Sequence, residues 1–356
     1  MDFFTSGETR TMANAFEKRM PVTTFLRDMF FGSVLTSPTA TIDMDFYKNR
    51  QIAAPFVADG VSSVNVSREG TQQRQYKPPM VAPSRILDLG LLEQRYTGEN
   101  PYMPMTAQER AELILQRDYN ELSDSITRTE EKMAAELLQT GKVVAKGYVD
   151  DKQSAAVINT IDYGFDNTIT VSATDKWDAT TPGNPMKTVD AATELVRKAG
   201  YDPTIMVVGA KAATAMLSNT DFVKTQFDIS RANLGMIDPQ ITSVSGNGFT
   251  LIGMLKMYNV YIYRYDAYYY DMEAKAVKPY IQPDKMILGA RDLGEMAYGA
   301  VTMIDEDTKQ PQTYETTRAS QMITNADGGI KKMIVRSRPI PKPFDVSAWA
   351  VASVTA

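Results

Sequence analysis

Apolar side chains recur at helical spacing between residues 106 and 139, which predicts one long helix. They fall three, four or seven positions apart and share one stripe of the helix surface: Leu115, Tyr119, Leu122, Ile126, Met133 and Leu137. Thr106 and Glu109 fit a capping box at its start, and Gly141 fits a left-handed stop at its end. At about 1.5 Å per residue the helix would be about 50 Å long. Because the stripe covers only about three heptads, we expect a single spine packed on a sheet and not a coiled coil.

Residues 51–86 have the pattern of a long, very polar β-hairpin. Its first leg contains the strand-like residues Val61, Val64 and Val66. Glu69 and Gly70 supply a turn, and the chain returns over residues 72–77 until Pro78 and Pro79 remove it from the ladder. An isolated two-stranded ribbon is marginal in water. The hairpin is therefore either loosely ordered or ordered by a partner.

Residues 1–50 are expected to form an arm that contains a short helix. The arm carries the cluster Phe25-Leu26-Arg27-Asp28-Met29-Phe30-Phe31, which is apolar with charges on one side. Side chains this aromatic must be buried. They pack either on the core of the same chain or on a neighbouring chain.

The remaining chain alternates irregularly between helical and strand-like runs, without the βαβ rhythm of a doubly wound sheet, so we expect the α+β class. Asn184 and Pro185 fit the start of a helix that Gly200 ends, and further helices are expected over 210–218 and 219–227. Trp177, in a polar loop, is expected to pack on the edge of its own domain. Strands are expected at 155–161, 168–171, 204–208, 249–252, 258–265, 285–290, 300–304 and 330–336. Pro339, Pro341 and Pro343 form a stiff extended stretch before an apolar segment over 346–354.

Composition excludes several kinds of chemistry. The 356 residues include no Cys and no His, which removes disulfides, thiolate nucleophiles, cysteine-ligated zinc and the commonest general base. The net charge is −5, without the basic excess of a tight nucleic-acid binder, although residues 328–356 carry five basic side chains and one acidic one. No apolar run approaches the ~18 residues of a membrane span, and the N-terminus has no signal-peptide core, so we expect cytoplasmic synthesis.

The motifs that could carry catalysis are weak. Gly141-Lys142 lacks the rest of a phosphate-binding loop. The acidic triplets 305–307 and 43–45 could ligate a hard cation, but acidic turns are usually solvated. The tyrosine-rich stretch 258–270 could stack on bases, but pairing within a sheet is the better interpretation, since Asp266 and Asp271 would repel phosphate. We therefore expect no catalytic residue, no cofactor and no metal.

Several segments, taken in order, resemble the lambda-type major capsid protein family, which has the Hong Kong 97-like capsid fold. They are the aromatic cluster 25–31, the stretch Ala54-Pro55-Phe56-Val57 with the hairpin up to Pro83, the helix over 106–138, Trp177 with the strand 205–209, the run Pro283 to Gly289, and Arg336-Ser337-Arg338-Pro339-Ile340-Pro341. No single motif is highly specific, but the ordered set covers nearly the whole chain.

The resemblance implies an architecture. Residues 1–50 would be the N-terminal arm and 51–86 the extended E-loop hairpin. Residues 87–183 would form the P-domain with its spine helix over 106–139, and 184–305 a compact A-domain. Residues 306–356 would return to the P-domain.

The resemblance also implies a function. The chain would be a structural subunit, not an enzyme, that self-assembles as hexamers and pentamers into an icosahedral head around phage double-stranded DNA. It would contact DNA weakly, have no membrane contact, and reside in the virion after assembly in the host cytoplasm. Because the chain begins almost at the arm, a separate scaffold protein is implied, along with a portal protein and a possible decoration protein. Expansion of a precursor shell is implied too, whereas no Lys, Asn and Glu trio matches covalent cross-linking.

Two alternatives remain open. One is another virion part, a tail-tube or decoration protein, although a tail-tube subunit should be mostly strands. The other is a carboxylate hydrolase using Asp305 and Asp307 with Mg²⁺. For the capsid subunit, the candidate inter-subunit contacts are Phe25, Phe30, Phe31, Arg68, Glu69, Arg74, Lys77, Arg336 and Arg338.

Overall fold

The computed structural model shows an α+β protein. It describes residues 22–47, 53–59, 62–63, 65, 71–88, 90, 92, 106–148, 156–179, 182–220, 222–223, 248–304, 310–325 and 330–356. Several predicted features lie outside these residues: Val61, Val64, Val66, Arg68, the turn at Glu69 and Gly70, most of the helix expected over 219–227, and the acidic triplet 305–307.

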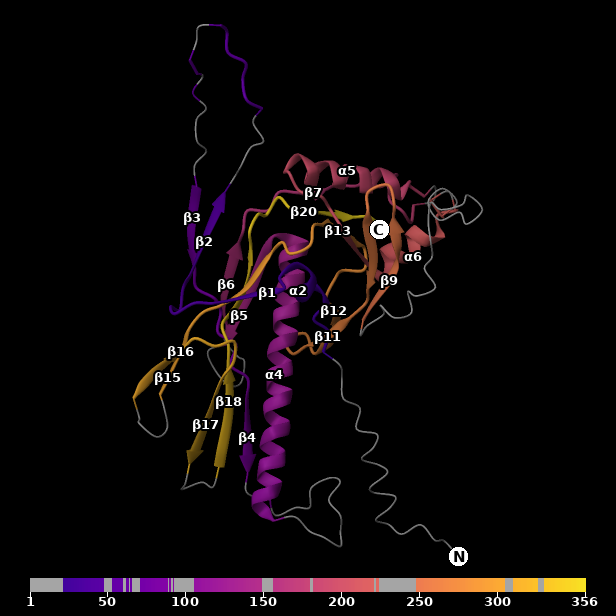
Figure 1. Ribbon diagram of the computed structural model, residues 1–356. Coiled ribbons are helices and arrows are strands. Elements are labelled where there is room, and N and C mark those ends of the chain that lie inside the picture. Colours follow the sequence, from indigo (N-terminus) through magenta and orange to yellow (C-terminus); the bar gives the residue numbers. More distant parts are fainter. Residues whose placement is uncertain are drawn as a thin grey trace, which may run out of the picture.

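The long helix is present as α4 (Ala107–Thr140) and runs along the length of the molecule (Figure 1). The capping box forms as expected: the Thr106 hydroxyl accepts from the Glu109 N–H, and the Glu109 carboxylate accepts from the Thr106 N–H at 2.8 Å. At the other end Gly141 takes a left-handed conformation, and its N–H donates to the Leu137 carbonyl. Both helix ends are therefore closed by the residues that the sequence placed there.

Replacing Gly141 by alanine is expected to lower the free energy of unfolding by about 2–4 kcal/mol. Gly141 has a φ of +68°, and a Cβ there would lie 2.1 Å from the Phe165 Cβ. The left-handed backbone costs an L-residue about 1–2 kcal/mol, and overpacking costs about 1–3 kcal/mol more. Gly164 is a matched control, because its φ is +73° but a Cβ there would meet nothing within 4 Å. Chemical denaturation should rank Gly141→Ala well below Gly164→Ala in stability; equal values would contradict this account.

A six-stranded sheet with the order β7-β20-β13-β8-β10-β9 forms the second large part of the fold. Its strands are β7 (Thr168–Ile169), β20 (Trp349–Ser353), β13 (Lys285–Gly289), β8 (Ile205–Gly209), β10 (Val260–Tyr265) and β9 (Phe249–Leu255). Helices α5 (Pro185–Lys198) and α6 (Ala210–Ser218) pack on one face, where Trp177 is also buried as expected. Helix α4 and the short α2 (Phe25–Phe30) pack on the other. Alternate residues of β8 enter the two cores, and a strand covered on both faces has an unbroken apolar sequence.

The C-terminal apolar run lies inside this sheet, as β20 between β7 and β13. Trp349 is fully buried, its Nε1 donates to the Leu138 carbonyl at 3.1 Å, and its ring stacks on Phe165. Residues 349–353, predicted to belong with the P-domain, thus pair with a strand of the segment 184–305. An apolar run of this kind must be buried on both faces, and the interior of the large sheet provides that.

Two three-stranded sheets lie beside α4. One consists of β17 (Ala319–Asn325), β18 (Ile330–Arg336) and β4 (Ser84–Asp88), and it packs on α4 through Leu122, Ile126, Met333 and Val335. The other consists of β1 (Ser33–Thr36), β14 (Gly294–Tyr298) and β19 (Pro339–Pro343). The proline-rich stretch, expected only to be stiff and extended, is thus an edge strand. Pro339, Pro341 and Pro343 occupy alternate positions, so their missing N–H groups cost the ladder nothing if they face away from β14.

Four pairs of strands form two-stranded sheets. They are β2 (Ile42–Tyr47) with β3 (Thr71–Tyr76), β5 (Lys142–Tyr148) with β6 (Ala156–Asp162), β11 (Tyr268–Asp271) with β12 (Ala276–Pro279), and β15 (Val301–Ile304) with β16 (Pro311–Tyr314). The return leg of the predicted hairpin is β3, but its partner is β2, in the segment assigned to the arm. The strand that pairs with residues 71–76 therefore begins before residue 51, because the turn signal at Glu69 and Gly70 is local and the pairing spans a longer connection.

Candidate assembly surfaces

The base of the β2–β3 ribbon is fixed to the body of the protein. Ile42 and Met44 of β2 are buried in the main core. The Tyr76 hydroxyl of β3 donates to the Asp162 carbonyl at 3.0 Å, and its ring stacks on Tyr163. These contacts hold the ribbon at one end only, and Figure 1 shows it directed away from the body.

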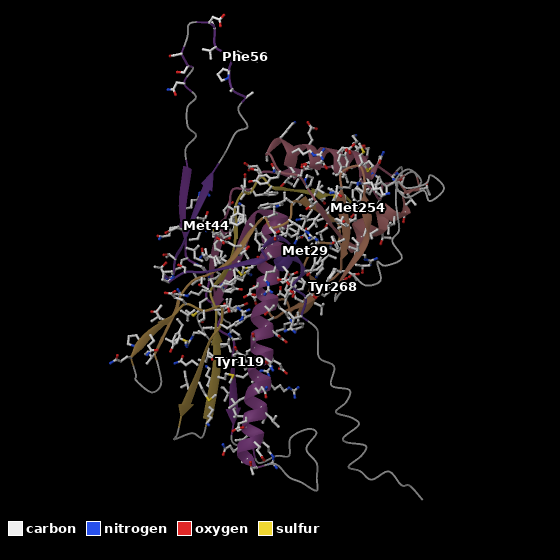
Figure 2. The ribbon with its side chains drawn as sticks, viewed as in Figure 1. Met29, Met44, Phe56, Tyr119, Met254 and Tyr268 are labelled. Atoms are coloured by element: carbon white, nitrogen blue, oxygen red, sulfur yellow. The ribbon has the colours of Figure 1, made fainter. Side chains whose placement is uncertain are left out.

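Far from that base, the described residues 53–59 are all exposed. Figure 2 labels Phe56 there, well separated from the other labelled side chains. Phe56 is 103% exposed and Val57 is 44% exposed. A phenylalanine held wholly in water forgoes roughly 1.5–3 kcal/mol of burial free energy. Phe56 is therefore a candidate contact for a partner, because burial there would recover this free energy.

Two predicted contact residues lie at the base of the ribbon. Arg74 of β3 is exposed, and its guanidinium donates to the Asp162 carbonyl at 3.5 Å. Lys77 follows β3 directly and is also exposed. The structure therefore places both on accessible surface, while Arg68 and Glu69 lie outside the described residues.

The two predicted arginines near the C-terminus lie at the end of β18. Arg336 is half-buried and donates to the Gln321 side chain of β17. Arg338 is half-buried too, and its Nε has no hydrogen-bond partner among the described residues. The segment that follows Lys77 reaches the same place, because Val81 and Ser337 form a β-bridge and Pro78 lies beside Gly299, whose N–H donates to the Arg338 carbonyl.

Phe25, Phe30 and Phe31 are buried in the core of their own chain, at 6%, 0% and 1% exposure. Phe25 stacks on Phe249 at a ring distance of 4.4 Å and on Tyr265 at 5.7 Å. Of the two environments that the sequence left open, the structure shows the chain's own core. The prediction that these three residues contact a neighbouring subunit therefore has no exposed aromatic side chain to support it in the described chain.

A buried carboxylate pair in the middle of α4 was missed by the sequence reasoning. Glu130 and Glu131 are both 0% exposed. Glu130 forms ion pairs with Arg27 at 2.9 Å and Arg318 at 2.6 Å, and it accepts from the Tyr298 hydroxyl at 3.0 Å. Glu130 lies four residues after Ile126 and three before Met133, so a carboxylate on the apolar stripe was the signal that could have revealed it.

The second carboxylate of the pair holds the N-terminal helix. Glu131 accepts the backbone N–H of Leu26 at 2.8 Å and of Arg27 at 3.0 Å, and the Tyr265 hydroxyl at 2.7 Å. Burial raises the pKa of Glu131 to about 7, against the opposing effects of these hydrogen bonds and of the Arg27 charge. Burial beside Glu130 likewise raises the pKa of Tyr298 to about 12. The pair joins segments that are distant in sequence, including α2, β10, β14 and the link before β17.

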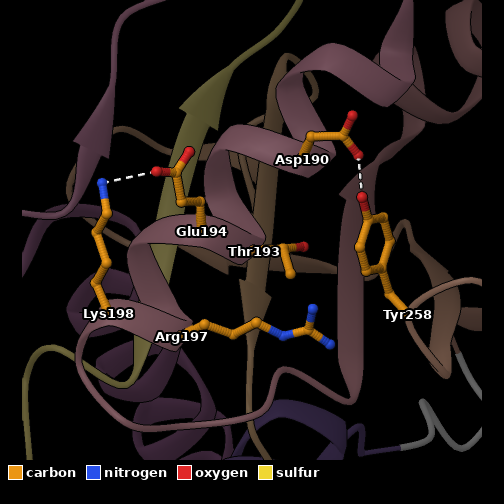
Figure 3. Close-up of a pocket in the computed structure, with 6 residues that line it drawn as sticks. All are labelled: Asp190, Thr193, Glu194, Arg197, Lys198 and Tyr258. Carbon is orange, nitrogen blue, oxygen red and sulfur yellow. Dashed lines mark hydrogen bonds and ion pairs between the residues drawn. The ribbon is translucent and has the colours of Figure 1, made fainter.

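The hollow between α5 and Tyr258 has a volume of about 390 Å³ (Figure 3). Its charges are satisfied locally: Tyr258 donates to Asp190 at 2.5 Å, and Lys198 pairs with Glu194 at 2.7 Å. Arg197 lies over the Tyr258 ring. The hollow therefore offers neither surplus charge nor a nucleophile paired with a base.

Two further searches cover the part of the chain that the structure describes. Within it, no group of three or more Asp, Glu, His or Cys side chains is placed to hold a metal ion. In the same residues, no helix combines the length and apolarity of a membrane span.

Solved structures similar to this chain include capsid proteins, and the fold is the Hong Kong 97-like capsid fold. The chain is similar to the putative capsid protein of a prophage of E. coli CFT073, with a TM-score of 0.66, 18% identity and 99% of each chain covered. It is also similar to the capsid protein of a native GTA particle, with a TM-score of 0.54, 14% identity and 96% and 93% coverage. A phage-related protein from Bordetella bronchiseptica RB50 gives a TM-score of 0.52 at 11% identity, with 97% and 96% coverage. The predicted fold class is thus confirmed.

The family described as phage major capsid protein E matches residues 8–354, so the chain belongs to that family. The protein is a major capsid protein, a structural subunit of a phage head, as the resemblance implied. The comparison with curated proteins finds no match. Family membership favours the head subunit over a tail-tube or decoration protein, and the 34-residue helix α4 is likewise unlike a mostly β tail tube.

Proposed function

We propose that this chain assembles as hexamers and pentamers into an icosahedral head that encloses phage double-stranded DNA. The observation that carries the proposal is the β2–β3 ribbon, which is anchored at its base and bears a fully exposed phenylalanine far from that base. A subunit that folds alone has no use for such an extension. In a shell, by contrast, neighbouring copies would cover the ribbon, which would then gain the burial that it lacks in the isolated subunit.

The division into arm, E-loop, P-domain and A-domain is part of the same proposal. The ribbon would be the E-loop, with β2 added to it. The P-domain would be α4 with the sheet β17-β18-β4, and the A-domain the six-stranded sheet with α5 and α6. Arg74, Lys77, Arg336 and Arg338 remain proposed contacts to neighbouring copies.

The partners and location complete the proposal. The net charge of −5 suits a shell that encloses DNA with weak, non-specific contact, since tight binding requires a basic surface. Assembly would take place in the host cytoplasm with a separate scaffold protein, and the head would contain a portal protein and could carry a decoration protein.

Replacing Phe56 by serine is expected to reduce shell formation at least tenfold while leaving the subunit folded. Phe56 makes no intrachain burial to lose, so the free energy of unfolding should change by less than about 0.5 kcal/mol. The contact to a neighbouring copy would lose roughly 2 kcal/mol per subunit, repeated throughout the shell. Sedimentation and electron microscopy of the purified protein measure assembly, and circular dichroism measures folding.

Phe56→Leu is the matched control, because it keeps most of the apolar area and should assemble normally. Shells from Phe56→Ser that equal the wild type in yield and stability would show that the exposed phenylalanine makes no assembly contact.

A further inference from the structure

The hairpin β11–β12 has one face packed on its own chain. Tyr269 packs on the Tyr280 ring at a centroid distance of 4.9 Å, and the Lys132 ammonium of α4 lies over the Tyr269 ring. Asp271 pairs with Lys278 across the hairpin at 2.5 Å. Figure 1 shows the hairpin beside α4. A two-stranded ribbon is marginal alone, so these contacts account for its order.

The opposite face of the same hairpin is apolar and open to solvent. Successive side chains of a strand point to opposite faces, so Tyr268 and Tyr270 lie on the side away from Tyr269. Val277 of β12 is directly opposite Tyr270 in the register. Tyr268, Tyr270 and Val277 are 57%, 60% and 65% exposed, and Met272 in the turn is 66% exposed. The hairpin is thus anchored by one face and presents a largely aromatic surface on the other.

The ribbon β5–β6 adjoins this surface. Val144, Lys146 and Tyr148 occupy alternate positions of β5, and Ile158 of β6 lies opposite Lys146. The three apolar side chains of this set are exposed. The Lys146 ammonium pairs with Glu273 in the β11–β12 turn at 2.6 Å, so the two ribbons meet there. The two-ribbon face is defined by Tyr268, Tyr270, Met272, Val277, Val144, Tyr148 and Ile158.

The two-ribbon face has the size of the nonpolar part of a protein interface. An aromatic side chain has about 150–250 Å² of surface, so the exposed fractions of these seven side chains amount to on the order of 600 Å². A standard interface buries about 800 Å² on each partner, a little over half of it nonpolar. A soluble monomer rarely exposes a larger apolar patch than roughly 300–600 Å². The face is therefore large enough to form one complete interface.

The charges around the face exclude a strongly charged partner. Lys142, Lys146 and Lys278 each pair with a carboxylate of the same two ribbons. Of the lysines that the structure describes on these ribbons, Lys275 alone has no ion pair. Nucleic acid is bound through several cations that neutralise phosphates, and one lysine does not supply them. The partner that fits is a largely uncharged, apolar protein surface.

We propose that a second copy of this chain covers the two-ribbon face. The inference rests on the proposed assembly into shells, in which every subunit meets copies of itself. A contact between copies recurs in every subunit, so an apolar face of this size would be covered throughout the particle. The contact is separate from the one proposed for Phe56, because the β2–β3 ribbon contributes no residue to the two-ribbon face.

Site-specific photo-crosslinking of the full-length chain tests the proposal. With p-benzoylphenylalanine at Tyr270, irradiation of assembled shells should link two copies of the chain, and mass spectrometry identifies the product. Dilute, unassembled subunits should give no such product. The same photoreactive group at Tyr269, on the packed face of the same strand, is the matched control and should not link copies. The substituted chain is mixed with an excess of wild-type chain, so that shells form even if it assembles poorly alone.

The possible outcomes separate this inference from the proposed function. Shells in which the group at Tyr270 links to no other copy would overturn the inference while leaving shell formation established. Links to DNA or to a scaffold protein in place of a second copy would overturn it too. If the wild-type chain formed no shells at all, the proposed function itself would be contradicted, and this inference with it.

Replacing both exposed tyrosines of the hairpin by serine is expected to lower the yield of shells about tenfold or more, because it removes the aromatic part of the contact. The double variant Tyr268→Ser, Tyr270→Ser loses little packing within the subunit, so its circular dichroism spectrum should stay that of the wild type. The matched variant Tyr268→Phe, Tyr270→Phe keeps both rings and should assemble normally. Equal yields of shells from the two double variants would overturn the proposal.

Discussion

Replacing Glu130 by alanine is expected to lower the free energy of unfolding by about 3–5 kcal/mol, because it removes one partner of a buried ion-pair network. The Glu130 side chain is 0% exposed and is shared by Arg27 and Arg318, whose side chains are only 25% and 14% exposed. Its loss would remove the buried carboxylate that Arg27, Arg318 and the Tyr298 hydroxyl share. Arg27 would keep only the exposed Asp28 as a charged partner, and Arg318 would keep only neutral oxygens. The alanine would also open a cavity in the middle of α4.

The effect is measured by chemical denaturation of the unassembled subunit. Glu112→Ala is the matched control, since Glu112 is exposed on the same helix and its loss should cost less than about 0.5 kcal/mol. Equal stability of the two variants would show that the buried ion-pair network contributes no more to the free energy of unfolding than an exposed glutamate does.

Reversing the charge of Arg74 is expected to abolish shell formation without unfolding the subunit. Arg74 is exposed at the base of the ribbon, and its hydrogen bond to the Asp162 carbonyl is long at 3.5 Å. The hydrogen bond from Lys142 and also the Arg74 charge lower the pKa of Asp162, so reversing the Arg74 charge should cost the fold no more than about 1 kcal/mol, the upper end for an exposed charge pair. In the shell, the Arg74→Glu carboxylate would face the group of a neighbouring copy that accepts the Arg74 guanidinium. The resulting electrostatic repulsion would recur at every copy of the interface.

Electron microscopy of the Arg74→Glu protein should show dispersed subunits or capsomers, with a wild-type circular dichroism spectrum. Arg74→Lys is the matched control, because it keeps the charge and should still form shells. Normal shells from Arg74→Glu would mean that this arginine makes no essential contact.

Elements with complete local signals were predictable from the sequence. The helix α4 has a capping box at Thr106, no Pro or Gly in its interior and a glycine stop, and each signal acts within a few residues. The same holds for α5, whose Asn184 side chain accepts from the Met186 N–H. Such features need no knowledge of the rest of the chain.

Pairings between distant segments could not be predicted in this way. The strand β3 was expected to pair with the residues just before Glu69, yet its partner is β2, and local turn signals contain no information about that choice. The position of β20 in the large sheet is a similar case, because burial on both faces identifies a central strand but not which sheet receives it.

The aromatic cluster 25–31 and the buried carboxylate pair show a third limit of prediction from sequence. The sequence indicated that Phe25, Phe30 and Phe31 must be buried, but composition alone does not say whether the cover comes from the same chain or from another. Glu130 and Glu131 hold α2 on its own chain, since they bind Arg27 and the first turn of that helix. The run of charges along α4 does not show which of its carboxylates are buried.

The central claim is that the β2–β3 ribbon is covered by neighbouring copies of the same chain. Electron cryo-microscopy of particles assembled from the purified protein, with scaffold protein if required, tests it most directly. The account predicts closed shells in which residues 53–59 of each subunit lie against an adjacent subunit and Phe56 is buried there. Shells in which this segment stays in solvent and touches no neighbour would contradict it.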